Sequence, residues 1–275
     1  MRYAICNETF EGWEHARTCA FVAELGYAGL EIAPFTLAPL ITDVSVSRRR
    51  ELRTQADAAG VQILGLHWLL AKTTGFQLTS PDADVRKHTA NYLGELARAA
   101  ADLGGDVLVL GSPAQRKVPD GFNYQQAEDF AVECLADVLP VLEQTGVKLC
   151  LEPLTRNETD FLNTAADAVR IIDRLQHPNV KLHLDVKAMA AESEPRPEVI
   201  AANAGHTYHF HANDENLRGP GFGTIDFKPL LGALHETNYR GWVSVEVFDY
   251  TPDPETIARE SIRYLRECEV ELQRR

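Results

Sequence analysis

One local pattern recurs along this chain and restricts the folds open to it: a helical stretch ends at glycine, and a short apolar run follows at once. It occurs at Gly26, Gly60 and Gly146, and at the pair Gly104-Gly105. Glycine suits the residue after a helix because the chain often turns left-handed there, where a Cβ is unfavourable. Apolar strands that alternate with helices predict βαβ units and a parallel sheet.

Eight candidate strands can be counted, and a helical pattern follows each one. The strands start near residues 3, 28, 61, 106, 147, 179, 206 and 241. The clearest helical patterns cover residues 84–103, 124–145, 164–175 and 254–272, and Pro140 should kink or divide the second of them. Eight such units in 275 residues predict an α/β fold, a single (β/α)8 TIM barrel domain over residues 1–275.

A doubly wound open sheet is the alternative arrangement of the same units. That fold usually places a glycine-rich turn after its first strand, where backbone amides bind a nucleotide phosphate. Here the first strand leads into Asn7-Glu8-Thr9-Phe10-Glu11, which offers no such turn. The sequence therefore favours the barrel.

Composition and charge narrow the class of protein further. Apolar residues make up 45% of the chain and its formal net charge is −13, so it can form a core but lacks the basic excess typical of nucleic-acid binding. No stretch approaches the roughly 18 apolar residues of a membrane span, and charge comes too early for a signal peptide. Five scattered cysteines fit a reduced protein. We therefore expect a cytoplasmic protein that binds neither nucleic acid nor membrane.

The last four predicted strands alternate polar and apolar residues, where a parallel strand covered on both faces would be continuously apolar. Because side chains alternate between the two faces of a strand, the polar residues share one face. These inner-face pairs are Cys150 and Glu152, His183 and Asp185, His209 and His211, and Ser244 and Glu246. We interpret His183 and His209, which lie deeper in their strands, as hydrogen-bonded core histidines.

In each of these strands the last polar residue stands at the carboxyl end, where barrel active sites lie. These residues are Glu152, Asp185, His211 and Glu246. Any one of them alone would more often be a helix cap or an ion-pair partner. Three carboxylates pushed together, however, repel one another unless a cation lies between them. The set therefore predicts one divalent metal ion, Mn²⁺ foremost, with Mg²⁺, Co²⁺ or Zn²⁺ as alternatives.

Several motifs between residues 150 and 250 point to one family. They are the segment 152–164 (EPLTRNETDFLNT), Asp185, the His-Phe-His that ends at His211, the Val-Glu that ends at Glu246, and the loop 213–227. With these motifs the chain resembles the xylose-isomerase-like TIM barrels of the sugar phosphate isomerase/epimerase group. Among these it is most similar to the ketose 3-epimerases of the tagatose/psicose type.

The resemblance implies that the four strand-end residues hold one Mn²⁺-like ion and that Glu152 and Glu246 also act as acid and base. Epimerisation beside a carbonyl removes a proton on one face and returns one on the other, so two bases and a cation suit a cis-enediolate. The implied function is isomerisation or epimerisation of a ketose or keto-sugar. Glu158 and Arg218 are the implied contacts to substrate hydroxyls.

One position departs from the family pattern. Ketose 3-epimerases usually carry a substrate-binding histidine three residues after the strand-six aspartate, and this chain has Ala188 there. The neighbouring Lys187 is an alternative donor, but a solvated lysine is the more ordinary interpretation. The exact substrate is therefore left open.

Three other segments are candidates for the substrate pocket. His67 and Trp68 end the third strand and indicate either a sugar-facing wall or a packed histidine and aromatic beneath a loop. Glu31 ends the second strand, and we interpret it as an ion-pair partner rather than a substrate contact. The glycines at positions 219, 221 and 223 indicate a flexible loop after strand seven.

Other functions share the predicted fold. A lyase, either inosose-dehydratase-like or eliminating from a 3-keto-glycoside, would use the same metal and one glutamate to expel a β-substituent. An endonuclease-IV-like hydrolase would need further histidines for a trinuclear zinc site, and strand four ends in Leu110-Gly111-Ser112 without one. A non-catalytic sugar-binding subunit would have no need of both Glu152 and Glu246. Besides a small-molecule sugar, the sequence leaves open a second copy of the chain, in a homo-oligomer.

Overall fold

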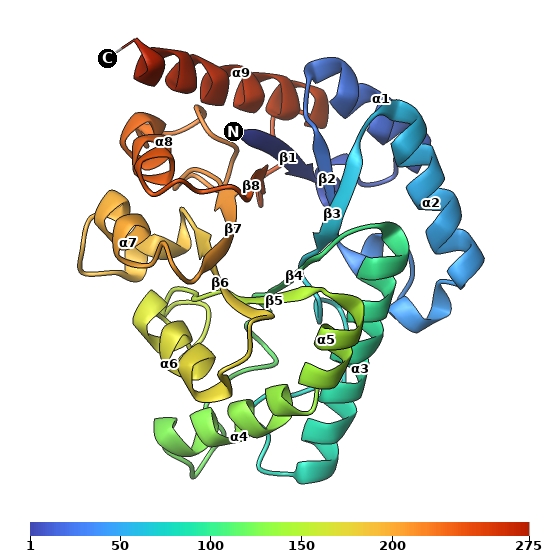
Figure 1. Ribbon diagram of the computed structural model, residues 1–275, viewed down its shortest axis with the longest axis vertical. Coiled ribbons are helices and arrows are strands. Elements are labelled where there is room, and N and C mark those ends of the chain that lie inside the picture. The colour runs from blue at the N-terminus through green and yellow to red at the C-terminus, as the bar shows by residue number, and fades with distance from the viewer. Residues whose placement is uncertain (275) are drawn as a thin grey trace.

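The computed structural model describes residues 1–274, and its eight parallel strands close into a barrel in which each strand pairs with the next and β8 pairs with β1 (Figure 1). The strands are β1 (Arg2–Cys6), β2 (Gly29–Ile32), β3 (Gln62–Leu66), β4 (Val107–Leu110), β5 (Lys148–Leu151), β6 (Val180–Asp185), β7 (Thr207–Ala212) and β8 (Trp242–Val245). Every strand begins next to its predicted start, and the predicted (β/α)8 barrel is confirmed.

Helices surround this barrel (Figure 1). They are α1 (His15–Leu25), α2 (Val46–Ala59), α3 (Ala83–Leu103), α4 (Tyr124–Ala136), α5 (Leu139–Thr145), α6 (Ala165–Leu175), α7 (Arg196–Ala202), α8 (Phe227–Glu236) and α9 (Pro254–Gln273). Short 3-10 turns follow β1, β2 and β6, at Asn7–Phe10, Pro34–Thr36, Ile41–Asp43 and Ala188–Ala191. Over residues 1–274, no helix combines the length and the apolar character that a membrane crossing requires.

Local sequence explains where several of these helices begin and end. Pro140 divides the predicted helix 124–145 into α4 and α5, and it stands in the first turn of α5, where a missing N–H is tolerated. The glycines that end α1 and α3 adopt the left-handed conformation, with φ of 89° at Gly26 and 90° at Gly104. At the start of α6, Thr164 and Asp167 form a reciprocal capping box.

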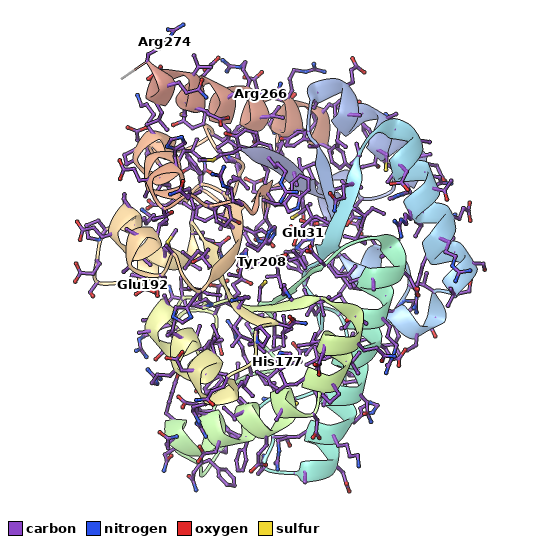
Figure 2. The ribbon with its side chains drawn as sticks, in the orientation of Figure 1. Glu31, His177, Glu192, Tyr208, Arg266 and Arg274 are labelled. Carbon is purple, nitrogen blue, oxygen red and sulfur yellow. The ribbon has the colours of Figure 1, made fainter. Side chains whose placement is uncertain are left out.

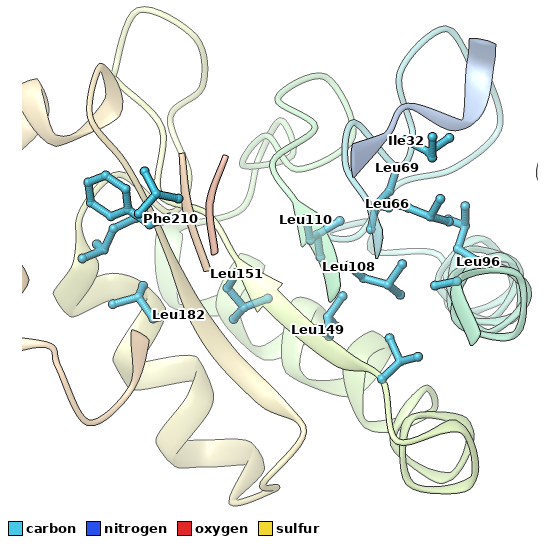
Figure 3. Close-up of a cluster of buried hydrophobic side chains, with 14 of the residues drawn as sticks. Ile32, Leu66, Leu69, Leu96, Leu108, Leu110, Leu149, Leu151, Leu182 and Phe210 are labelled. Carbon is cyan, nitrogen blue, oxygen red and sulfur yellow. The ribbon is translucent and has the colours of Figure 1, made fainter. Parts of the chain in front are cut away.

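The strands bury side chains on both faces, in two clusters. Outward-facing leucines of neighbouring strands, among them Leu108, Leu149 and Leu182, pack toward the surrounding helices (Figure 3). The inward-facing cluster consists of Ala4, Leu64, Val107, Val109, Cys150 and Trp242. In β5 and β8, Cys150 and Trp242 precede the polar inner-face residues of the same segment. An apolar layer therefore fills the lower part of the barrel, and the polar residues lie above it, toward the carboxyl ends of the strands.

Gly65 allows β3 and β4 to approach closely, because a Cβ at this position would collide with the backbone carbonyl of Val107. We expect Gly65→Ala to lower the free energy of unfolding by about 1–3 kcal/mol, since the added methyl group must push the two strand backbones apart. Urea denaturation followed by circular dichroism measures this change. Gly205→Ala is the matched control, since its Cβ would meet no atom within 4 Å. An equal loss of stability in both variants would contradict the close-approach explanation.

Candidate metal centre and active site

Four acid or imidazole side chains come together at the carboxyl ends of strands β5 to β8. Glu152 follows β5, Asp185 ends β6, His211 lies in β7 and Glu246 follows β8. The register pairs Asp185 with His211, and His211 with Ser244, which stands two residues before Glu246. None of the four side chains belongs to a residue more than 6% exposed. The barrel thus brings together the four residues that the sequence predicts as metal ligands.

Several nitrogen and oxygen atoms of this cluster lie close together, and some of them lack a hydrogen-bond partner within the described chain. Ligand atoms of Glu152, Asp185, His211 and the deeper His183 all lie within 4.8 Å of one another, a group that does not include Glu246. The interpretation of His183 as a hydrogen-bonded core histidine is wrong, because neither of its ring nitrogens has a hydrogen-bond partner within residues 1–274. Nδ1 of His211 lies 3.1 Å from Oε2 of Glu246, and within residues 1–274 neither atom has a hydrogen-bond partner of good geometry. Buried polar atoms are rarely left unsatisfied. A cation coordinated by these atoms would satisfy them.

Burial and mutual repulsion act on the carboxylates of the cluster. Burial, together with the charges of Glu246 and Asp185, raises the pKa of Glu152 to about 8. Burial and the charge of Glu246 likewise raise the pKa of Asp185 to about 6. Burial also tends to raise the pKa of Glu246, but contacts with His211 and His67 outweigh burial and hold this pKa below the usual range. A divalent cation would relieve the repulsion, so this oxygen-rich set fits a hard ion such as Mn²⁺ or Mg²⁺.

Glu31 orients the histidine of this cluster. It is fully buried within the ring of strands (Figure 2), with its Oε2 2.9 Å from Nε2 of His209 and 3.1 Å from Nε2 of His211. A carboxylate on Nε2 leaves Nδ1 of His211 directed toward Glu246, and metal-binding histidines are commonly held in this way. This geometry agrees with the interpretation of Glu31 as a charge partner.

His67 and Trp68, for which the sequence left open a sugar-facing wall or a packed histidine and aromatic, both contact Glu246. Nδ1 of His67 lies 3.2 Å from Oε1 of Glu246, and its Nε2 lies 2.9 Å from Oε2 of Glu8. His67 is fully buried between these two carboxylates, which corresponds to the packed-histidine alternative. Nε1 of Trp68 donates to Oε1 of Glu246 at 2.7 Å, and Trp68 also lines the cavity. Sequence reasoning missed Glu8, whose one signal is its place two residues after the end of β1.

A cavity of about 330 Å³ opens beside the carboxylates, at the lower end of the range for ligand sites. Glu152 and Glu246 both line it. The rings of Trp68 and Phe248 form an aromatic part of its wall and stack with centroids 5.8 Å apart. The cavity therefore offers charged groups and an aromatic surface side by side.

Glu158 and Lys187 form an ion pair in the wall of this cavity, with 2.7 Å between Nζ and Oε1. The side chain of Lys187 is only 15% exposed, so the expectation of a solvated lysine is wrong. Ala188 is buried, and its N–H donates to Oδ1 of Asp185 at 2.7 Å. Of these two neighbours, therefore, Lys187 and not Ala188 presents its side chain to the cavity.

Arg218 lies on the loop after β7, where its Nε donates to Oδ2 of Asp249 at 2.9 Å. Its side chain is 37% exposed and is not among the residues that line the cavity within the described chain. A contact between Arg218 and substrate hydroxyls stays a prediction.

The glycine-rich loop after β7 folds around a carboxylate. Asp214 is fully buried and accepts hydrogen bonds from the backbone N–H groups of Glu215, Gly223 and Thr224. A Cβ on Gly223 would collide with this carboxylate, so glycine is required there. The loop is thus held by a buried side chain, which differs from the flexible loop that its glycines suggested.

Arg116 fixes the backbone of Glu152 and was missed by sequence reasoning. It is 1% exposed, and its Nη1 donates to the carbonyl oxygens of Glu152 at 2.6 Å and Leu110 at 3.3 Å. Beside it, a Cβ on Gly111 would collide with the Glu152 carboxylate. A lone arginine in an irregular loop carries no periodic signal, so only the folded chain reveals this contact.

Known proteins share this fold and parts of this sequence. The pattern that defines xylose isomerase-like TIM barrels matches residues 19–268. A D-psicose 3-epimerase from Ruminiclostridium cellulolyticum is 31% identical over 233 residues, covering 82% of this chain and 76% of that protein. The 3-dehydro-D-guloside 4-epimerase of Escherichia coli is 35% identical over 138 residues, 49% of this chain and 53% of that protein.

Solved structures agree on the fold. The crystal structure of D-psicose 3-epimerase with D-tagatose, from Clostridium cellulolyticum H10, superposes on 99% of both chains with a TM-score of 0.85 and 23% sequence identity. Together with the family pattern over residues 19–268, this means that the chain belongs to the xylose isomerase-like TIM barrel family.

Proposed function

We propose that this sugar epimerase or isomerase acts on a ketose or keto-sugar, depends on a divalent metal ion and transfers a proton through a cis-enediolate. The observation that carries the proposal is the pair of buried carboxylates, Glu152 and Glu246, that line one cavity. The epimerases among its relatives support the same class of reaction.

Epimerisation moves a proton between the two faces of the carbon beside a carbonyl, so one group must accept a proton and another must donate one. Glu152 follows β5 and Glu246 follows β8, three strands further around the ring. Their carboxylates therefore reach a central ligand from different sides. Arg116 holds the backbone of Glu152, while His67 and Trp68 hold the carboxylate of Glu246. In this proposal His67 acts through Glu246 instead of touching the sugar.

Glu152, Asp185, His211 and Glu246 are the residues that would hold the metal ion. When bound, a divalent ion supplies a Lewis acid that stabilises negative charge on the enediolate oxygens. The unsatisfied atoms of His211 and Glu246, and the repulsion that raises the pKa of Glu152, support this assignment. Mn²⁺ is the ion we expect first, with Mg²⁺, Co²⁺ and Zn²⁺ as alternatives.

Three further residues are expected contacts to the substrate, and the cysteines bear on the cellular location. Glu158 lines the cavity and is the carboxylate we expect to contact a sugar hydroxyl, and Trp68 offers an aromatic surface to the apolar face of the sugar. Arg218 is a further candidate contact from the loop after β7. All five cysteines are free and buried, which supports a reduced, cytoplasmic setting.

A lyase is the second candidate, and one relative favours it. A protein named 3-dehydro-D-guloside 4-epimerase is 35% identical over 138 residues, and a 3-keto-glycoside carries its glycosidic oxygen on C1, β to the C3 carbonyl. Epimerisation at C4 removes the C4 proton, whereas removal of the C2 proton would give an enolate that can expel the oxygen on C1 as an alcohol. An inosose-dehydratase-like reaction would follow the same logic, with loss of water.

Solvent deuterium uptake tests the reaction. We expect Mn²⁺-loaded enzyme in D₂O to place deuterium at the carbon beside the carbonyl of one member of a panel of ketohexoses, ketopentoses, their phosphates, inosose and a 3-keto-glucoside. Proton and carbon NMR would show the label together with a new epimer or isomer. Exchange followed by loss of water or alcohol would instead establish the lyase, and absence of exchange across the panel would contradict the enediolate.

Two variants test the acid and base. Glu152→Gln and Glu246→Gln should each lower the exchange rate by roughly 100- to 10,000-fold, as is typical for loss of general acid–base catalysis. Metal content measured on the same samples separates loss of proton transfer from loss of the ion. Near wild-type exchange in either variant would remove that residue from the mechanism.

Metal removal tests the ligand set. Adding Mn²⁺ to EDTA-treated enzyme should raise the midpoint of thermal unfolding, because an ion that binds only the folded state adds about 2.7 kcal/mol at 100 times its Kd. Asp185→Asn should lose most of this rise in a calorimetric scan. Glu236→Gln, at an exposed position at the end of α8, is the control and should keep it. An equal rise in both variants would mean that the ion binds elsewhere.

A further inference from the structure

His183 is a buried histidine to which the proposed reaction gives no role. Its side chain is fully buried, and within residues 1–274 neither Nδ1 nor Nε2 has a hydrogen-bond partner of good geometry. The neighbouring histidines His67, His209 and His211 differ from it, because each has a ring nitrogen 2.9–3.1 Å from a glutamate oxygen. Buried polar groups are rarely left without a partner, so His183 calls for one.

The pairing of β6 with β7 brings His183 to the inner face beneath the proposed ligands. The register shifts by one residue between Leu182 and His183, after which His183 pairs with His209 and Asp185 with His211. Irregularities of this kind twist a strand locally and redirect its side chains, and they are common beside active sites. Because side chains alternate along a strand, His183 then lies on the same face as Asp185, one step deeper in the barrel.

The ring of His183 is close enough to the cluster to share an ion with it. Its Nε2 lies 4.0 Å from Oε1 of Glu152. Two atoms that bind one ion at about 2.1 Å each are at most about 4.2 Å apart, so this separation allows both to bind the same ion. The rings of His183 and His211 are 4.2 Å apart between centroids and meet at 74°. The two imidazoles therefore approach the same carboxylates without stacking on each other.

We propose that His183 is a further ligand of the metal ion, beside Glu152, Asp185 and His211. The inference rests on the proposed function, because it concerns the ion that the reaction would use. With His183 the ion would have two imidazole ligands instead of one. Imidazole nitrogen suits later transition-metal ions such as Co²⁺ and Zn²⁺, whereas Mg²⁺ prefers oxygen. His183 therefore raises the affinity for Co²⁺ and Zn²⁺ relative to Mg²⁺.

His209 is the other deep histidine of this cluster, and its contacts give it a different task. Its Nε2 lies 2.9 Å from Oε2 of Glu31, so this nitrogen already has a charged partner. Within the described chain, the group of ligand atoms that contains the carboxylates of Glu152 and Asp185 includes His183 but not His209. His183 thus belongs to the side of the cluster that holds the carboxylates, and His209 supports Glu31.

Proton NMR of the Co²⁺-loaded protein counts the imidazole ligands. A coordinated neutral imidazole keeps a proton on its second ring nitrogen, and the unpaired electrons of Co²⁺ shift the signal of that proton far outside the usual range. We expect two such signals in wild type, identified as nitrogen-bound by their absence from protein prepared in D₂O. A single signal in wild type would overturn His183 as a ligand, and this outcome requires no variant.

Variants assign the two signals. His183→Leu removes the ligand atom at similar volume and should leave one signal. His235→Leu, the same change at an exposed histidine of α8, is the matched control and should keep both. His209→Gln should also keep both, because glutamine can still donate to Glu31. Loss of a signal in His209→Gln, with both kept in His183→Leu, would overturn the assignment.

The affinities for two ions test the selectivity. His183→Leu should raise the Kd for Co²⁺ by at least about 10- to 100-fold, the size of effect that follows from losing even an outer partner of a metal ligand. The Kd for Mg²⁺ should change less than about threefold, because Mg²⁺ readily keeps water in place of a protein ligand. Titration of EDTA-treated protein measures both values, by chelator competition for Co²⁺ and by calorimetry for Mg²⁺. Equal losses of affinity for the two ions would contradict a nitrogen ligand.

The stability of the metal-free protein separates a ligand from an ordinary core histidine. EDTA-treated His183→Leu should unfold at or above the midpoint temperature of EDTA-treated wild type, because it removes a buried polar group that has no partner. Added Co²⁺ should then raise this midpoint less than it does in wild type. A metal-free variant that unfolds well below wild type would overturn the proposal, since His183 would then have a stabilising partner without the ion.

Deuterium exchange on the same Co²⁺-loaded samples distinguishes this inference from the proposed function. Two imidazole signals without exchange in any sugar of the panel would support His183 as a ligand and refute the reaction. Exchange with a single imidazole signal would do the reverse. Bound Co²⁺ without any shifted imidazole signal would overturn both His183 and His211 as ligands, and failure to bind Co²⁺ would overturn the metal centre as a whole.

Discussion

The interior of this barrel holds buried carboxylates that must be paired or neutralised, and much of the structure follows from that requirement. They are Glu8, Glu31, Glu152, Asp185 and Glu246, none of them more than 6% exposed. An unpaired charge in such a place is strongly destabilising. Two histidines meet most of the requirement: His67 contacts Glu8 and Glu246, and His211 contacts Glu31 and Glu246.

Neighbouring histidines do not compensate the buried carboxylates equally. Glu246 has histidines on both sides, so its pKa lies below the usual range, whereas burial and neighbouring acids raise the pKa of Glu152 and Asp185. Glu152 and Glu246 line the cavity, so one acid of each kind faces it. A divalent cation is the simplest remedy for that imbalance. In the proposed function, a cation bound here would lie beside the two glutamates, Glu152 and Glu246, to which we assign proton transfer.

Away from the metal cluster, the cavity wall follows a different principle. Lys187 and Glu158 neutralise each other, and the stacked rings of Trp68 and Phe248 carry no charge. The ion pair, the stacked rings and the two carboxylates Glu152 and Glu246 thus line different parts of one cavity.

Local patterns in the sequence were sufficient for the architecture. Glycine-terminated helices and period-two strands depend only on backbone geometry within a few residues, so the eight strands and the division at Pro140 could be predicted. The alternation also showed that Glu152, Asp185, His211 and Glu246 share the inner face. In parallel strands of one barrel, residues at the same place in their strands meet at the same height. That is why these four could be grouped before the fold was known.

The partner of each side chain was decided only by tertiary structure. His67 turns toward Glu8 and Glu246, and Lys187 reaches Glu158, because loops from different units are packed together at the carboxyl end of the barrel. Arg116 holds Glu152 for the same reason. Periodicity tells which face a residue occupies, but contacts between units far apart in the chain depend on loop paths that no local pattern encodes. The sequence by itself determined the barrel and the shared inner face of the four residues that we propose as metal ligands. The folded chain decided which residues support and line the site, because those contacts join segments far apart in the sequence.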